Sequence, residues 1–138
     1  MISEQTKILV VDDFDLVRTM LRRALGDLKI TNIDDARDGD EALRKISDAI
    51  KSNKPYGAVF LDWNMPGTNG LQVLQQCRTM PEMASVPIIM VTAEGEKKQV
   101  IAALMAGATE YIVKPCSPEI LSKKIQHINK TLQSKKAG

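Results

Sequence analysis

The sequence predicts an α/β fold, a doubly wound parallel sheet of five strands with helices on both faces. Short continuous runs of Val, Ile and Leu alternate with segments of helical periodicity, a pattern typical of strands buried in a parallel sheet. Alternating units of this kind need right-handed crossovers and give three layers. Four of the apolar runs end on polar side chains. They are Ile8 to Val11 before Asp12 and Asp13, Ala58 to Leu61 before Asp62, Ile88 to Val91 before Thr92, and Tyr111 to Val113 before Lys114.

The amino-terminal part of the chain is expected to hold two strands and two helices. The first strand covers about Lys7 to Val11, and a helix follows from about Phe14 to Leu28. Asn32 to Ala36 is a more polar strand, which we place at the sheet edge, and a second helix covers about Asp40 to Ala49. The first helix has apolar residues at core-facing spacing, namely Val17, Met20, Leu21, Ala24, Leu25 and Leu28.

In the middle of the chain, Gly57 to Asp62 is the third strand. Asn69 is a suitable N-cap for a helix that ends near Met80, and Pro81 to Val86 is a loop before the fourth strand.

Two more helices follow the fourth and fifth strands. Lys97 to Ala106 is expected to be helical and to end at Gly107, a residue type favoured at helix C-termini. Ser117 followed by Pro118 indicates an N-cap with proline at the first helical position, which opens a helix to about Leu132.

Length, charge and hydropathy exclude several classes of protein. At 138 residues and a formal net charge of +2, the chain fits one domain over residues 1–138 with no output domain. We expect no signal peptide and no membrane insertion, hence a cytoplasmic protein, because the N-terminus is polar and no apolar stretch reaches the length of a membrane span. Cys77 and Cys116 lack metal-ligand spacing and are expected to be reduced and structural.

The basic residues near the C-terminus indicate a solvated helix face and not a nucleic-acid site, because no aromatic platform or recognition motif accompanies them. They are Lys123, Lys124, Lys130, Lys135 and Lys136.

The polar strand ends suit a site for a divalent cation and a phosphoryl group. Parallel strands present their carboxyl ends at one edge of the sheet, so these side chains are expected to converge there. Asp12, Asp13 and Asp62 offer the oxygen ligands that Mg²⁺ prefers, and Mn²⁺ takes similar ligands. A carboxylate can attack phosphorus, while Thr92 and Lys114 would stabilise the phosphoryl oxygens.

Four segments carry these polar groups, and together they resemble the signature of the response-regulator receiver domain. They are Val10-Val11-Asp12-Asp13, Asp62-Trp63-Asn64-Met65-Pro66-Gly67, Val91-Thr92-Ala93-Glu94 and Tyr111-Ile112-Val113-Lys114-Pro115. The resemblance covers the whole chain and is strongest to the stand-alone chemotaxis regulators. It implies a flavodoxin-like fold with strand order 2-1-3-4-5, and a single-domain response regulator of a two-component system.

The resemblance also implies the role of each acidic residue. Asp62 is expected to accept a phosphoryl group from a sensor histidine kinase. Asp13 and Asp62 are expected to bind Mg²⁺ together with the backbone carbonyl of Asn64, and Asp12 to act through metal-bound water.

The remaining site residues are assigned by the same resemblance. Thr92 and Lys114 contact the phosphoryl group, and the Lys114-Pro115 peptide bond is expected to be cis. Tyr111 matches the aromatic switch residue that moves inward behind Thr92 on activation. Asn64 and Glu94 line the approach of hydrolytic water and tune dephosphorylation.

The expected output is phosphorylation-dependent binding to a protein such as a flagellar motor switch component. An aspartyl-phosphate phosphatase is a further expected partner, and the chain is expected to assist its own phosphorylation and dephosphorylation without being an enzyme. A phosphorelay intermediate, a phosphate sink and a regulator of a non-motile pathway are alternatives within the same family. Cys116 departs from the pattern, because a large aromatic residue commonly follows Lys-Pro.

An alternative from another class is a haloacid-dehalogenase-type phosphatase, whose Asp-x-Asp nucleophile motif Asp13-Phe14-Asp15 resembles. Those enzymes need a carboxylate after the lysine to complete the Mg²⁺ site. Here Glu119 is the only acid beyond Lys114, and Asp62 would have no role. The receiver interpretation is therefore preferred.

Overall fold

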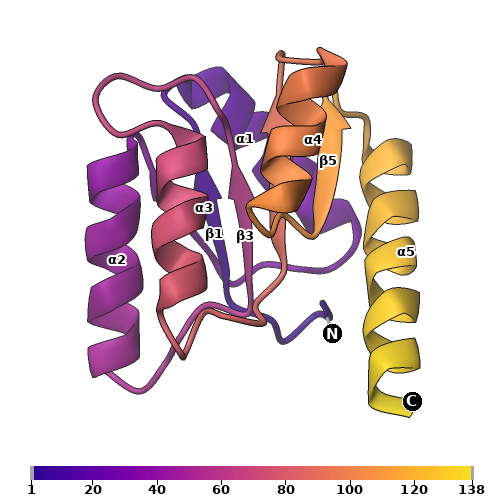
Figure 1. Ribbon diagram of the computed structural model, residues 1–138. Coiled ribbons are helices and arrows are strands. Elements are labelled where there is room, and N and C mark those ends of the chain that lie inside the picture. Colours follow the sequence, from indigo (N-terminus) through magenta and orange to yellow (C-terminus); the bar gives the residue numbers. More distant parts are fainter. Residues whose placement is uncertain (1, 138) are drawn as a thin grey trace.

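Five parallel strands form one sheet in the order β2-β1-β3-β4-β5, so the predicted fold class and strand order are confirmed. The structure is a computed structural model that describes residues 2–137, with the side chains of residues 2–133. Strands and helices alternate along the chain (Figure 1). The elements are β1 Ile8–Val11, α1 Asp15–Asp27, β2 Ile33–Ala36, α2 Gly39–Lys51, β3 Ala58–Leu61, α3 Gly70–Thr79, β4 Ile88–Thr92, α4 Lys97–Met105, β5 Glu110–Val113 and α5 Pro118–Ala137.

Helices cover both faces of the sheet and give the three layers expected (Figure 1). Helices α2, α3 and α4 pack on one face, where Leu9 and Val11 of β1 point. Helices α1 and α5 pack on the other face, against Ile8 and Val10. Alternate residues of a buried strand serve opposite faces, which explains why β1 and β3 are apolar throughout.

Local capping signals were read correctly from the sequence. Asn69 and Gln72 form a reciprocal capping box at the start of α3, with nitrogen–oxygen distances of 3.0 and 2.9 Å. The Ser117 hydroxyl accepts a hydrogen bond from the Ile120 N–H at 3.2 Å, as an N-cap does. Gly107 has a φ of +106° just beyond α4, a conformation that favours glycine.

The expected inward face of α1 was wrong at one position. Met20 is 49% exposed, whereas the neighbouring Arg18 is 6% exposed. Arg18 shares the buried stripe with Leu21 and Leu25 at spacings of three and four residues, and it is buried because its guanidinium finds acceptors at Asp12 and Asp35. Periodicity counts only apolar residues and therefore missed a cation whose charge is paired.

The last helix is longer than expected, because α5 continues past Leu132 to Ala137. Lys and Gln are good helix formers and extend the helix after the apolar pattern stops. Lys123 and Lys130 are exposed, as a solvated face requires. The side chains of Lys135 and Lys136 lie outside the described residues. None of the helices between residues 2 and 137 combines the length and apolar character that crossing a membrane would need.

Candidate functional site

Three aspartates meet at the carboxyl edge of the sheet. Asp12 and Asp13 follow β1, Asp62 follows β3, and the two strands are paired with Val11 opposite Leu61. Oxygen atoms from all three carboxylates lie within 4.8 Å of one another. Among the residues whose side chains the structure describes, 2–133, these three aspartates form the one group of acidic side chains close enough together to hold a metal ion.

Asp12 is buried and held from several directions. Its backbone N–H donates to the carbonyl of Ala36 at 3.1 Å. Its Oδ1 accepts from the Phe14 N–H at 2.9 Å, and its Oδ2 lies 2.7 Å from Lys114 Nζ. This carboxylate therefore has little freedom to rotate.

Asp62 is also buried, at 5% exposure. Its Oδ1 accepts from the Trp63 N–H at 2.8 Å, and its Oδ2 lies 3.5 Å from Lys114 Nζ. Burial raises the pKa of the Asp62 carboxyl, and the Asp12 carboxylate raises it further, while the Thr92 hydroxyl and Lys114 oppose the rise. The charged form of Asp62 is thus under-compensated by the protein alone.

Asp13 is the most exposed of the three aspartates, yet one of its oxygens is buried without a partner. Its Oδ1 makes no hydrogen bond. Buried carboxylate oxygens are normally satisfied, so this orphan fits a ligand that the protein does not itself provide. An orphaned oxygen beside two further carboxylates is the donor set of a hard cation such as Mg²⁺. The residues present therefore fit the expected metal.

Thr92 and Lys114 complete the edge from the neighbouring strands β4 and β5. Thr92 is fully buried, and its hydroxyl accepts from the Glu94 N–H at 3.3 Å. The Lys114 N–H donates to the Thr92 carbonyl at 2.9 Å. The Lys114-Pro115 peptide bond is cis, as expected.

Tyr111, Glu94 and Asn64 are brought together above this edge. The Tyr111 hydroxyl donates to the Glu94 carbonyl, and the Asn64 amide donates to the Glu94 carboxylate. Tyr111 is 8% exposed, so its ring lies inward. Burial raises the pKa of the Tyr111 hydroxyl, with the Glu94 and Asp62 carboxylates adding to the rise. The loop after β4 is thus linked to β5 and to the loop after β3.

Backbone packing supports the acidic pocket from beneath. Gly70 opens α3 so close to the Asp62 carbonyl that a Cβ there would lie 2.0 Å from the oxygen. Only glycine allows this approach of helix to strand end. The sequence predicted a helix after Asn69 but assigned no role to Gly70, so its contact with Asp62 was missed.

Cys116 and Lys114 both line a mostly apolar cavity of about 340 Å³ between α1 and the segment after β5. Burial raises the pKa of the Cys116 thiol, and also raises the pKa of the Cys77 thiol, to about 11. Both thiols are free. Cys116, which follows Lys-Pro where a large aromatic residue is common in the family, is one of the residues that line this cavity. The cavity is lined by Val17, Met20, Leu21, Val91, Lys114, Pro115 and Cys116.

Comparison with known proteins agrees with this geometry. The family model of the response regulator receiver domain matches residues 8–126. The chain belongs to the response regulator receiver family. The dehalogenase-type alternative is thereby set aside. The receiver chain is 38% identical over 122 residues to the chemotaxis protein CheY of Pseudomonas aeruginosa, a match that covers 88% of this chain and 94% of that protein. It is also 38% identical to the chemotaxis protein CheY1 of Helicobacter pylori, over 87% of this chain and 94% of the relative.

Solved receiver structures are similar over most of the chain. The chemotaxis protein CheY4 of Vibrio cholerae matches with a TM-score of 0.78 at 32% identity, covering 89% of this chain and 98% of that one. A CheX–CheY complex with BeF3 and Mg²⁺ from Borrelia burgdorferi matches with a TM-score of 0.79 at 27% identity, covering 89% and 88%. Both are flavodoxin-like receivers of chemotaxis proteins.

Proposed function

We propose that this receiver is a single-domain response regulator that accepts a phosphoryl group on Asp62 from a sensor histidine kinase. The observation that carries the proposal is the under-compensated Asp62 carboxylate beside the orphaned Asp13 oxygen. A cation and a phosphoryl group should bind such a site more favourably together than singly, because the positive cation offsets the negative charge of the phosphoryl oxygens and of the carboxylates.

Asp12, Asp13, Asp62 and the backbone carbonyl of Asn64 would hold Mg²⁺, or Mn²⁺ in its place, with Asp12 acting through metal-bound water. The cation would neutralise charge on the phosphoryl oxygens. A carboxylate oxygen of Asp62 attacks phosphorus, an oxygen–phosphorus bond forms, and the bond to the donor histidine nitrogen breaks as the imidazole leaves. Lys114 Nζ, which lies 3.5 Å from Asp62 Oδ2 and 2.7 Å from Asp12 Oδ2, would pair with a phosphoryl oxygen.

The chain assists its own phosphorylation and dephosphorylation but turns over no separate substrate, so we propose that it is not an enzyme. Asn64 lies two residues after Asp62, Glu94 lies two residues after Thr92, and their side chains contact each other. We assign them to the path of the hydrolytic water. An aspartyl-phosphate phosphatase is the partner that would accelerate this step.

The signal would leave through the surface above Thr92 and Tyr111. The Thr92 hydroxyl donates to the phosphoryl group and draws the loop carrying Glu94 inward, and Tyr111 holds that loop through the Glu94 carbonyl. Large apolar side chains are exposed on α4 and β5, where an output protein can cover them. They are Ile101, Leu104, Met105 and Val113. The likeness to chemotaxis proteins supports a cytoplasmic output partner of the flagellar motor switch type.

The test is phosphorylation with a small acyl phosphate, or trapping with beryllofluoride, in the presence of Mg²⁺. We expect modification at Asp62 by peptide mapping, none in Asp62→Asn, and phosphorylation-dependent binding of a flagellar switch peptide. Label on Asp13 would overturn the proposed chemistry. If Asp62 is phosphorylated but peptide binding does not increase, the proposed phosphorylation chemistry stands. The output would then be that of a phosphorelay intermediate or a phosphate sink.

A further inference from the structure

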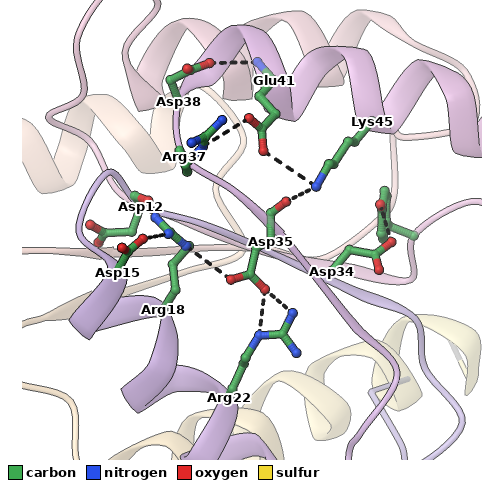
Figure 2. A network of polar contacts seen from close by, with 11 residues as sticks. Asp12, Asp15, Arg18, Arg22, Asp34, Asp35, Arg37, Asp38, Glu41 and Lys45 are labelled. Atoms are coloured by element: carbon green, nitrogen blue, oxygen red, sulfur yellow. Dashed lines mark hydrogen bonds and ion pairs between the residues drawn. The ribbon is translucent and has the colours of Figure 1, made fainter.

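A buried arginine lies directly behind the acidic pocket. Arg18 of α1 is 6% exposed, and its guanidinium lies among Asp12, Asp15 and Asp35 (Figure 2). Its Nη1 donates to the backbone carbonyl of Asp12 at 2.5 Å, its Nε donates to the Asp35 carboxylate at 3.2 Å, and its Nη2 donates to Asp15. One planar group thus ties the end of β1 to β2 and to the first turn of α1.

The contact with the Asp12 carbonyl distinguishes Arg18 from its neighbours. That carbonyl belongs to the peptide unit that joins Asp12 to Asp13, the two metal-site carboxylates of β1. The orientation of this peptide decides where the Asp13 side chain starts. The other anchors, from Ala36, Phe14 and Lys114, hold the N–H and carboxylate of Asp12 but not its carbonyl.

Arg22 provides a natural contrast one helical turn later. It shares the Asp35 carboxylate, which its Nε approaches at 2.6 Å. Its side chain is 44% exposed, against 8% for Arg18. Figure 2 shows Arg22 on the side of Asp35 away from Asp12. The two arginines therefore differ in their reach to the pocket while sharing helix, charge and one partner.

We propose that Arg18 is a positioning residue for the metal site, setting the peptide between Asp12 and Asp13 so that the carboxylates are aligned before Mg²⁺ arrives. The inference rests on the proposed function, because it deepens the metal site assigned there. Two physical effects act together. The guanidinium fork holds the buried carbonyl in one orientation, and its charge is paired with the Asp15 and Asp35 carboxylates, which reduces its repulsion of an incoming cation.

The test is calorimetric titration with Mg²⁺, followed in parallel by the emission of Trp63, which adjoins Asp62 in the chain. Partners behind metal ligands typically contribute about 10- to 100-fold in metal affinity. We expect Arg18→Met to weaken Mg²⁺ binding by about 10-fold or more. Arg18→Lys should recover only part of the loss, because one ammonium can donate a single hydrogen bond to the carbonyl but cannot reproduce the fork.

Two controls separate positioning from a general weakening of α1. Arg22→Met removes a cation from the same network, and Leu25→Ala opens a cavity under the same helix. We expect both to keep Mg²⁺ affinity within about twofold of the wild type when folded, because neither side chain touches Asp12. Equal losses in these controls would overturn the proposal, and so would an Arg18→Met variant with wild-type affinity.

A further variant distinguishes failure of the inference from failure of the proposed function. Asp13→Asn removes a metal-site carboxylate and should lose the Mg²⁺ heat and the Trp63 response. If Asp13→Asn binds Mg²⁺ like the wild type, the metal site itself is misassigned. If Arg18→Met does not fold, Arg18→Lys decides, and wild-type affinity in that variant would overturn the role of the guanidinium fork.

Discussion

The amino edge and the carboxyl edge of the sheet both hold charged side chains, a half-buried arginine at one and buried aspartates at the other, but satisfy them differently. At the amino edge, Arg78 donates to the carbonyls of Gly107, Met83 and Val86 at 2.9, 2.7 and 2.9 Å. At the carboxyl edge, the Asp13 Oδ1 has no hydrogen-bond partner, and the pKa of Asp62 is raised by burial and by Asp12. The charged group at the amino edge thus holds the loops before β4 and β5 in place. The carboxyl edge keeps a carboxylate oxygen that is available to bind a ligand.

Other polar groups follow the same division. The Tyr56 hydroxyl, before β3, donates to Asp34 at 2.7 Å, and the Lys7 ammonium lies 4.6 Å from the centre of the Tyr56 ring. Burial raises the pKa of the Tyr56 hydroxyl, with Asp34 adding to the rise, so this group stays a neutral donor. In folded proteins, polar groups that lack hydrogen-bond partners or paired charges tend to occur at functional sites. Variants at the two edges should therefore move stability and activity in different ways.

The largest expected effect is on stability, from Arg78→Met at the amino edge. The variant leaves several backbone carbonyls without their charged donor, and bonds to charged groups are worth about 1.5–3 kcal/mol. We expect the free energy of unfolding to fall by about 2–3 kcal/mol in urea titrations. Arg44→Met, an exposed change on α2, should cost less than about 0.5 kcal/mol.

The same Arg78→Met protein should keep its Mg²⁺ affinity and its modification at Asp62. An altered metal affinity in folded Arg78→Met would show that the two edges are coupled, and the comparison between them would fail.

The sequence predicted the fold and most of the pocket for a simple reason. Apolar runs, capping residues such as Asn69 and Ser117, and acids at strand ends are local signals that need no knowledge of packing. The positions that it missed depend on contacts distant in sequence. Arg18 looks like a surface cation until the Asp12 carbonyl and Asp35 are placed beside it. Arg78 gains its role only when the loops before β4 and β5 surround it.

Tyr111 shows a different limit. The sequence marked it as a switch residue, but its contact with the Glu94 carbonyl depends on how the loop after β4 folds back. No spacing rule links these two positions, and the same holds for Gly70 beneath the Asp62 carbonyl. The sequence therefore predicted which side chains carry the chemistry of the site, but it did not predict where the backbone makes close contacts.

The second prediction concerns coupling at the carboxyl edge. Thr92→Ala keeps Asp62 and the proposed metal ligands, so we expect it to accept a phosphoryl group. It loses the hydroxyl that we propose to link the phosphoryl group to the Glu94 loop. Coupling between sites is typically about 1–3 kcal/mol, and we expect most of it, about 1–2 kcal/mol, to disappear.

The measurement is a titration of a flagellar switch peptide against free and beryllofluoride-bound protein. Tyr111→Gly should likewise accept phosphate and lose the affinity ratio between the two forms. If both variants keep the wild-type ratio of peptide affinities between the beryllofluoride-bound and free forms, coupling through Thr92 and Tyr111 is ruled out. A large fall in the stability of Thr92→Ala would contradict the proposed difference between the two edges.

The smallest expected effect is a gain of stability from removing the proposed phosphoacceptor. The pKa of Asp62 lies above its ordinary value of 3.8 in the folded protein, so between these two values the folded state binds more protons than the unfolded state. The contribution of Asp62 to stability without metal therefore falls as pH rises through that window. Asn does not ionise, so the advantage of Asp62→Asn should be absent at low pH and grow toward neutral pH. We expect a rise in Tm of about 4 °C, roughly 1 kcal/mol for a domain of this size.

Thermal unfolding from about pH 4 to pH 8 without Mg²⁺ measures this rise in Tm, with exposed Asp27→Asn as the matched control. A constant advantage at every pH would mean that packing, and not the charge of Asp62, limits stability at this edge.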